Sequence, residues 1–384
     1  MSKTILISNV TIVNYDREIT GDLFIRDGKV EKIGQALQVE ADIFLDGTEK
    51  NWIVMPGFID MHIHGSAGFD MMDATEEALR GMSRSLVKEG TTSYLPTTIT
   101  QRVDAIEAAL ENVNGFVNNA DEAEVLGIHV EGPYISTKWA GAQPIEHISE
   151  PSIEQFLKWQ QLSGNRIKQV TVAPEIVGGF EFVQAMSEEG IISSIGHSDA
   201  SSDEVEKAVQ LGAKQATHLY NQMRPFHHRD TGVVGSVLLD DHMKVEIIVD
   251  YIHSHMKAVN LAYRLKGAEG IILITDAMRA KGLEYGEYDL GGQTVYVTEK
   301  GAHLSSGALA GSILTMDQAV RNMKQTTGCS LQELVSMSST NAAKQLKLSH
   351  KGYIEEGFDA DLVILDLELN VQKTICRGNI VFES

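Results

Sequence analysis

The sequence predicts an α/β protein: a (β/α)8 TIM barrel with a small β-sandwich domain formed by both chain ends. Short β-rich segments separated by turn signals occupy the first 55 residues and return after residue 350. Between them, apolar runs of strand length alternate with amphipathic helical stretches. Eight such runs with crossover segments match a closed barrel better than an open doubly wound sheet. No Gly-x-Gly-x-x-Gly follows a strand, so a dinucleotide-binding fold has no motif to support it.

The small domain is expected at residues 1–55 and 346–384, because both ends share a β-rich texture that differs from the middle. Turn signals such as Asp27-Gly28 and Arg377-Gly378 separate its strands. Its expected strands are 4–13, 19–26, 29–33, 42–46, 360–365, 373–376 and 380–382. The two ends would then build one sheet domain, with the barrel inserted between them.

The barrel is expected at residues 56–345. Its expected strands are 57–64, 92–98, 125–131, 168–173, 191–196, 214–219, 244–250 and 270–275. Its expected helices are 75–89, 103–117, 152–162, 180–189, 202–211 and 254–265. A long insertion at 280–311 follows the eighth strand and contains a hairpin of residues 288–290 and 293–297.

Composition excludes several classes of partner. The formal net charge of −21 repels nucleic acid and anionic membranes, so neither is expected to bind. Only two cysteines are present, which argues against a disulfide framework and for a reducing compartment. The N-terminus lacks the apolar core of a signal peptide, and no stretch approaches the roughly 20 apolar residues of a membrane helix. We therefore expect a cytoplasmic protein whose partner is a small molecule.

His62 and His64 end the first barrel strand, immediately before a glycine. Residues two apart in a strand point to the same face, so the two imidazoles form half of a metal site. Considered alone, the two histidines could equally be hydrogen-bonded polar residues that bind no metal. The other possible ligands further along the chain decide between these interpretations.

Further polar residues fall at the ends of other predicted strands, on the face where barrel enzymes build their sites. They are Glu131 after strand three, His197 after strand five, His218 after strand six and Asp276 after strand eight. Taken singly, His197 fits a hydrogen-bonded core histidine and Asp276 fits a turn cap. Together the six residues indicate a metal-dependent hydrolase site for zinc, iron or manganese. His129 faces the same way as Glu131 and is expected to support the ligands or to be a polar core residue.

These motifs resemble the amidohydrolase superfamily, and more narrowly its deacetylases of phosphorylated N-acetyl amino sugars, over essentially the whole chain. The motifs are Pro-Gly-Phe-Ile-Asp-Met-His-Ile-His-Gly, His-Val-Glu-Gly-Pro-Tyr, Gly-His-Ser-Asp-Ala, Thr-His-Leu-Tyr-Asn and Ile-Thr-Asp-Ala. The resemblance implies hydrolysis of the N-acetyl amide of N-acetylglucosamine 6-phosphate to glucosamine 6-phosphate and acetate.

The resemblance also implies a role for each metal-site residue. Glu131, His197 and His218 would hold the principal divalent ion. His62 and His64 would hold a second, with Glu131 bridging the two, so that one or two ions are expected per subunit. Asp276 would take a proton from water and return it to the departing nitrogen.

Substrate recognition is expected from residues near the metal site. The cationic segment 224–229 suits a sugar phosphate, although a solvated loop without a ligand fits it equally. The resemblance implies that Arg229 contacts the phosphate and reaches the neighbouring subunit's site, which implies a homodimer. The other implied substrate-binding residues are Ala142, Gln143, Asn221, Gln222, His253, Leu309, Ala310 and Gly311.

Gln143 stands where some members carry a histidine that polarises the substrate carbonyl. Glutamine donates a hydrogen bond but carries no positive charge, so the carbonyl is expected to depend more on a second metal. Two alternatives remain at this point. One is another amidohydrolase, such as a cyclic-amide hydrolase or a purine deaminase, and the other is a non-catalytic barrel used as an interaction protein.

Overall fold

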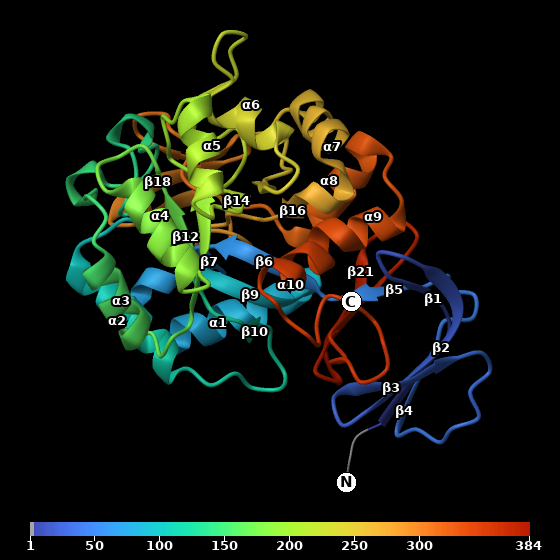
Figure 1. Ribbon diagram of the computed structural model, residues 1–384. Coiled ribbons are helices and arrows are strands. Elements are labelled where there is room, and N and C mark those ends of the chain that lie inside the picture. Colours follow the sequence, from blue (N-terminus) through green and yellow to red (C-terminus); the bar gives the residue numbers. More distant parts are fainter. Residues whose placement is uncertain (1–3) are drawn as a thin grey trace.

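Eight parallel strands form a nearly closed barrel in the computed structural model, which describes residues 4–384 (Figure 1). The barrel strands are β6 (Phe58–Ile63), β9 (Thr91–Thr98), β11 (Ile128–Glu131), β12 (Ile167–Val172), β13 (Ile192–Ile195), β14 (Gln215–Ala216), β15 (Lys244–Ile247) and β16 (Ile271–Leu273). Each strand pairs in parallel with the next, in chain order. The barrel prediction is confirmed. The third expected strand is divided, because β10 (Glu124–Val125) precedes β11 and pairs with β9 alone.

The seam between the first and last strands is closed by backbone hydrogen bonds. The Asp276 N–H donates to the carbonyl of His62 at 2.8 Å, and the His64 N–H donates to the carbonyl of Ala277 at 2.9 Å. The Asp60 carboxylate adds a side-chain contact, accepting from the Thr275 N–H at 3.3 Å. The seam therefore joins the first expected ligand pair directly to Asp276.

Helices cover the outside of the barrel, since their apolar faces pack on parallel strands (Figure 1). They are α1 (Glu76–Leu86), α2 (Val103–Gly115), α3 (Ile153–Leu162), α4 (Gly179–Glu188), α5 (Ser202–Gln210), α6 (Gly232–Leu239), α7 (Met256–Gly270), α8 (Met316–Thr327), α9 (Leu331–Val335) and α10 (Asn341–Gln345). Short turns are η1 (Met71–Asp73), η2 (Val87–Glu89), η3 (Thr137–Trp139), η4 (Ile145–His147) and η5 (Ser336–Thr340). Sequence reasoning missed α6, because nearly all its residues are buried and it lacks an apolar stripe. No helix within residues 4–384 is long and apolar enough to cross a membrane.

The expected small domain is present as a mixed sheet that both chain ends build together (Figure 1). Its strands are β1 (Thr4–Val13), β2 (Glu18–Arg26), β3 (Lys29–Gly34), β4 (Ile43–Asp46), β5 (Ile53–Pro56), β20 (Leu362–Leu365), β21 (Val371–Cys376) and β22 (Asn379–Glu383). The join is the antiparallel pair of β5 and β20. One apolar cluster contains residues of both ends, including Ile5, Ile7 and Ile364. The domain limits after residues 55 and 345 remain a prediction.

The insertion after β16 forms a small antiparallel sheet beside the barrel mouth. Its strands are β17 (Gly286–Leu290), β18 (Gln293–Thr298) and β19 (Gly301–Leu304), of which the third was not expected. A further pair, β7 (Gly65–Ser66) and β8 (Phe69–Asp70), follows the first barrel strand. Leu290 and Val295 of the insertion pack with Ile99, Met278 and Ala310. This apolar contact places the insertion over one side of the site.

Candidate active site

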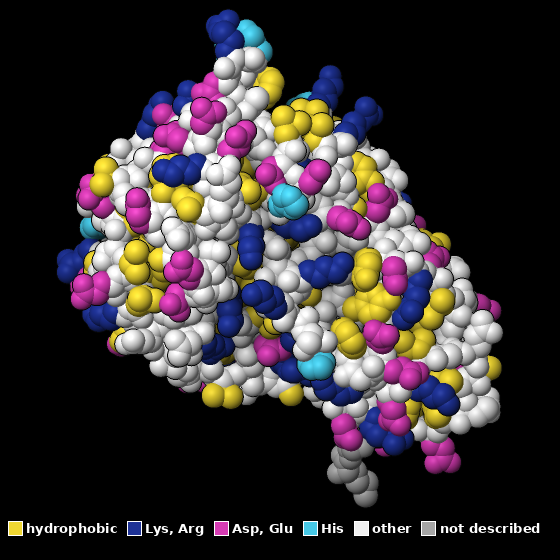
Figure 2. All heavy atoms as spheres, viewed as in Figure 1, with side chains coloured by type: hydrophobic (Ala, Val, Ile, Leu, Met, Phe, Trp, Pro, Cys, Tyr) yellow, Lys and Arg dark blue, Asp and Glu magenta, His cyan; other side chains and the backbone are white. Residues whose placement is uncertain are grey.

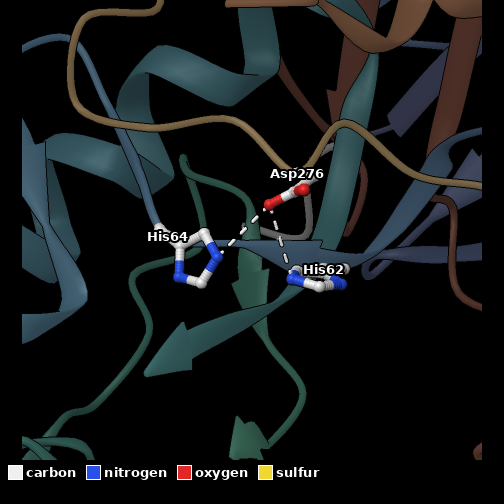
Figure 3. Close-up of side chains that lie close together, drawn as sticks. All are labelled: His62, His64 and Asp276. Atoms are coloured by element: carbon white, nitrogen blue, oxygen red, sulfur yellow. Dashed lines mark ion pairs between the residues drawn. The ribbon is translucent and has the colours of Figure 1, made fainter. Parts of the chain in front are cut away.

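All six polar residues expected at the strand ends meet at the carboxyl-terminal mouth of the barrel. They form two groups whose possible ligand atoms lie within 4.8 Å of one another. The groups are His62, His64 and Asp276, shown in Figure 3, and Glu131, His197 and His218. Every member is buried. The structure therefore brings together residues more than 200 positions apart in the chain, as the barrel prediction required.

Three of these residues have left-handed backbone conformations. The φ angles are 48° at His197, 31° at His218 and 49° at Asp276. Such values are uncommon for residues other than glycine, and they cluster at functional sites. Each of these residues lies two or three positions beyond its strand, where the chain leaves the barrel wall. The strained turn ends the strand and aims the side chain across the mouth.

Glu131 lies between the two groups. Its Oε1 is 3.1 Å from His218 Nε2, 3.3 Å from His197 Nε2 and 3.4 Å from His62 Nε2. Its Oε2 is 3.3 Å from His64 Nε2. A single carboxylate thus faces four imidazoles. This arrangement suits a ligand that bridges two cation positions.

Asp276 approaches the histidine pair from the opposite strand across the seam (Figure 3). Its Oδ1 is 3.2 Å from His64 Nε2 and 3.5 Å from His62 Nε2. Both dashed contacts in Figure 3 end on the same carboxylate oxygen. Asp276 therefore lies beside the histidine pair and lines the open side of the site.

The ring orientation of three histidines is fixed by contacts to their other nitrogen. His197 Nδ1 is 2.8 Å from the carbonyl of Trp139, and His64 Nδ1 is 3.2 Å from the carbonyl of Thr97. His62 Nδ1 is 3.1 Å from Glu246 Oε2. Carbonyl and carboxylate oxygens accept only, so each Nδ1 carries a proton, and Nε2 is the nitrogen that can give its lone pair to a metal. This is the tautomer a metal ligand needs.

The electrostatics of the cluster favour cations. Burial raises the pKa of Glu131, but His62 and the hydrogen-bonded His197 bring it well below its usual value. Burial lowers the pKa of His64, but hydrogen bonds that it donates to Asp276 and Glu131 raise it overall to about 9. The carboxylates thus stabilise positive charge on the imidazoles. A divalent cation among the same groups would be stabilised by the same attraction.

A buried nitrogen without a hydrogen-bond partner also supports a cation site at these residues. His62 Nε2, which faces Glu131 and Asp276, is one of the buried side-chain atoms of residues 4–384 that have no hydrogen-bond partner. A buried polar atom without a partner costs about 1–3 kcal/mol, and a cation beside Nε2 would remove that cost. A set of imidazole and carboxylate donors suits zinc, iron or manganese. The residues present therefore fit the expected cofactor.

A pocket of about 250 Å³ opens beside Glu131 and Asp276. Seven of the nine expected substrate-binding residues line it: Ala142, Gln143, Asn221, Gln222, His253, Leu309 and Gly311. Ala310 does not, because it is fully buried in the apolar contact below the insertion. Arg229 is exposed and does not line the pocket of its own chain. Ile99 and Leu290 line the pocket without having been expected, since isolated apolar residues give no signal in a sequence.

Gln143 has both ends of its amide engaged. Its Nε2 donates to Glu131 Oε2 at 2.7 Å, and its Oε1 accepts from the Thr100 N–H at 2.7 Å. The side chain therefore joins strand β9 to the bridging carboxylate. Its remaining N–H is the only one left for a substrate carbonyl.

Two buried residues complete the surroundings of His62. Sequence reasoning missed Glu246, although a charge inside the apolar run Val-Glu-Ile-Ile is a usable signal. His129 lies with its Nε2 2.7 Å from Thr171 Oγ1, and its ring centroid is 4.5 Å from that of His62. Burial, with His62 nearby, puts the pKa of His129 well below its usual value. His129 is therefore a neutral neighbour of the ligand groups.

Comparisons with known proteins agree with this geometry. The amidohydrolase family model matches residues 53–381. The chain is 58% identical to N-acetylglucosamine-6-phosphate deacetylase of Lysinibacillus sphaericus, over 98% of this chain and 97% of the relative. The corresponding deacetylase of Thermotoga maritima superposes with a TM-score of 0.90 at 37% identity, covering 99% of this chain and 100% of that one. A mutant deacetylase of Mycobacterium smegmatis, in complex with N-acetyl-D-glucosamine-6-phosphate, superposes at 0.91 with 27% identity and covers 99% of each chain. The chain belongs to the amidohydrolase family, among its N-acetylglucosamine-6-phosphate deacetylases.

Proposed function

We propose that the chain hydrolyses the N-acetyl amide of N-acetylglucosamine 6-phosphate to glucosamine 6-phosphate and acetate. The observation that carries the proposal is the complete set of four histidines and two carboxylates around a pocket, in a chain 58% identical to such a deacetylase. A non-catalytic barrel would be expected to lack part of this set.

The two groups would each hold one divalent ion, with Glu131 between them. Zinc, iron and manganese all suit these donors, and availability decides among them. A divalent ion here would supply Lewis acidity, making water ionise near neutral pH and polarising a carbonyl oxygen. The histidines hold their Nε2 atoms toward this position through the Nδ1 contacts described above.

Asp276 would move the proton. Burial raises its pKa, but His62 and His64 lower it overall, so the carboxylate is ionised at neutral pH. It therefore accepts a proton from the attacking water at Oδ1 or Oδ2. After hydroxide adds to the amide carbon, the Asp276 acid gives this proton to the nitrogen. The C–N bond then breaks, and acetate and the free amine leave.

The substrate would lie in the pocket with its acetamide near Glu131 and Asp276. His253 faces this space with its Nδ1 2.7 Å from Asp250 Oδ2. Burial lowers the pKa of His253, but Asp250 raises it overall, so the ring gains cationic character beside a phosphorylated ligand. Asn221 and Gln222 add amide donors and acceptors for sugar hydroxyls.

We also propose a homodimer, because Arg229 lies outside its own pocket. It lies in segment 224–229, in the loop between β14 and α6, where exposed Arg and His side chains gather at a protruding tip (Figure 2). An apolar groove beside this loop is lined by Phe226, Leu239, Leu261 and Leu265, all largely exposed. A second copy covering the groove would bury these apolar side chains, and the proposal assigns the Arg229 of that copy to this pocket.

Acetate release tests the proposed reaction. The wild-type protein should release acetate from N-acetylglucosamine 6-phosphate and far less from the unphosphorylated sugar. Asp276→Asn should keep its metal content and lose about 10²–10⁴-fold in turnover. Activity on neither sugar would overturn the proposal, and near-normal turnover of the variant would overturn the role of Asp276. Sedimentation of the wild-type protein as a monomer at assay concentration would overturn the dimer.

A further inference from the structure

Glu246 lies on β15, completely buried inside the barrel beneath the site. It is neither one of the proposed ligands nor a substrate contact, and it reaches the site only through the His62 ring and the His218 backbone. A carboxylate in this position is costly unless every lone pair has a donor. Its contacts therefore indicate what it does.

Oxygen Oε1 of Glu246 is held by two amides. Gln169 Nε2 donates to it at 2.6 Å and Gln215 Nε2 at 2.7 Å. Gln215 Nε2 also donates to Gln169 Oε1 at 2.8 Å, which fixes the direction of both amide groups. This oxygen therefore meets donors only, and the carboxylate has little freedom to rotate.

Oxygen Oε2 faces the metal site. It lies 3.1 Å from His62 Nδ1 and 3.4 Å from the backbone N–H of His218. Because a carboxylate only accepts, His62 Nδ1 carries the proton. The lone pair is left on Nε2, which lies 3.4 Å from Glu131 Oε1 and 3.5 Å from Asp276 Oδ1.

We propose that Glu246 is a positioning residue that fixes the tautomer and ring orientation of His62. Through His62, it sets the metal affinity of the group His62, His64 and Asp276. The inference rests on the proposed function in one respect: it assumes that the group His62, His64 and Asp276 holds a second metal ion. Carboxylate partners of metal-binding histidines typically change metal affinity by 10–100-fold when they are replaced.

Glu246→Gln tests the direction of the hydrogen bond with almost no change in volume. The two amide donors on the Oε1 side require an oxygen there, so the new amide nitrogen would face His62 Nδ1. That nitrogen donates, which would force Nδ1 to accept and would move the proton of His62 to Nε2. The lone pair needed for a metal would then be lost. Glu246→Asp keeps an acceptor and should retain part of the affinity.

The experiment measures zinc per subunit and zinc affinity by titration of metal-free protein, with unfolding temperature measured in parallel. Wild type should bind two ions, and Glu246→Gln should lose at least 10-fold in affinity for one of them. His62→Ala should weaken the same ion. Gln345→Ala is the matched control, because Gln345 Nε2 donates to Gln215 Oε1 at 3.1 Å without touching Glu246. It should bind two ions normally.

Three results would overturn the inference. The first is unchanged zinc binding in Glu246→Gln, even with a lower unfolding temperature, because Glu246 would then be merely structural. The second is equal loss of both ions, and the third is a wild-type protein that binds one ion. Acetate release by the wild type is measured separately, so failure of the proposed reaction and failure of this inference remain distinct.

Discussion

A buried ion pair beside the barrel seam makes the stability of the protein depend on pH. Glu89 ends the turn η2, and Lys281 follows the loop that carries Asp276. Their exposed fractions are 5% and 2%, and Lys281 Nζ lies 2.9 Å from Glu89 Oε1. Burial raises the pKa of Glu89 to about 7, although Lys281 opposes the rise. At neutral pH this carboxyl is therefore still partly protonated.

The size and sign of the effect follow from the two pKa values. The unfolded carboxyl has its usual pKa of 4.5, and the folded one about 7. Between these values the folded chain keeps a proton that the unfolded chain releases, so raising the pH favours unfolding. The difference corresponds to about 3 kcal/mol. This contribution is fully present below pH 4.5 and is lost as the pH rises through about 7.

The assay is urea unfolding of metal-free protein at intervals between pH 5 and pH 8. The reference is the double variant Glu89→Gln, Lys281→Met, which removes both charges at similar volume. The wild type should lose up to about 3 kcal/mol relative to the variant over this range. Parallel curves for the two proteins would refute the reasoning, because the variant lacks the Glu89 carboxyl.

Three further predictions concern the site. Gln143→Leu should lower the free energy of unfolding by about 1–3 kcal/mol, because Glu131 loses a donor and the Thr100 N–H loses its acceptor. Urea unfolding measures this, and an unchanged midpoint would contradict the contacts. Removing metal with a chelator should lower the unfolding temperature. An ion present at one hundred times its Kd raises the free energy of unfolding by about 3 kcal/mol, and the chelator removes this contribution. Reloading zinc should restore the temperature, and equal temperatures before and after would argue against a site in the folded state. Arg229→Ala should raise KM for the phosphorylated sugar and leave the unphosphorylated sugar unaffected, whereas the exposed control Arg102→Ala should change neither.

Much of the barrel could be read from the sequence because strand and helix periodicities are local. Strands β6 and β9, and helices α2 and α3, lie within one or two residues of the expected ranges. Periodicity failed for α6, which is apolar on nearly all sides and so shows no stripe. It also overextended β14, where the chain turns away two residues before the candidate ligand His218.

The candidate ligands were also readable, since strand ends share one face in any parallel barrel. His62, Glu131 and Asp276 were placed by that rule, and the structure brings His62 Nε2 within 3.4 Å of Glu131 and 3.5 Å of Asp276. Arg229 and Ala310 could not be placed in this way. Both residues lie on loops, and sequence periodicity does not predict the path of a loop. The position of Ala310 depends on packing against the insertion, and the proposed role of Arg229 depends on another subunit.

The sequence by itself determined which residues face the mouth of the barrel, because strand alternation and strand ends are set within a few residues. Only the tertiary structure decided which of them touch. His62 meets Asp276 through closure of the seam, and it meets Glu246 through the inward face of a strand 184 positions away. Contacts of that kind depend on the stagger and closure of the whole sheet. The closure of the barrel therefore decides which residue pairs with a buried charge. The local sequence pattern shows only that such a charge needs a partner.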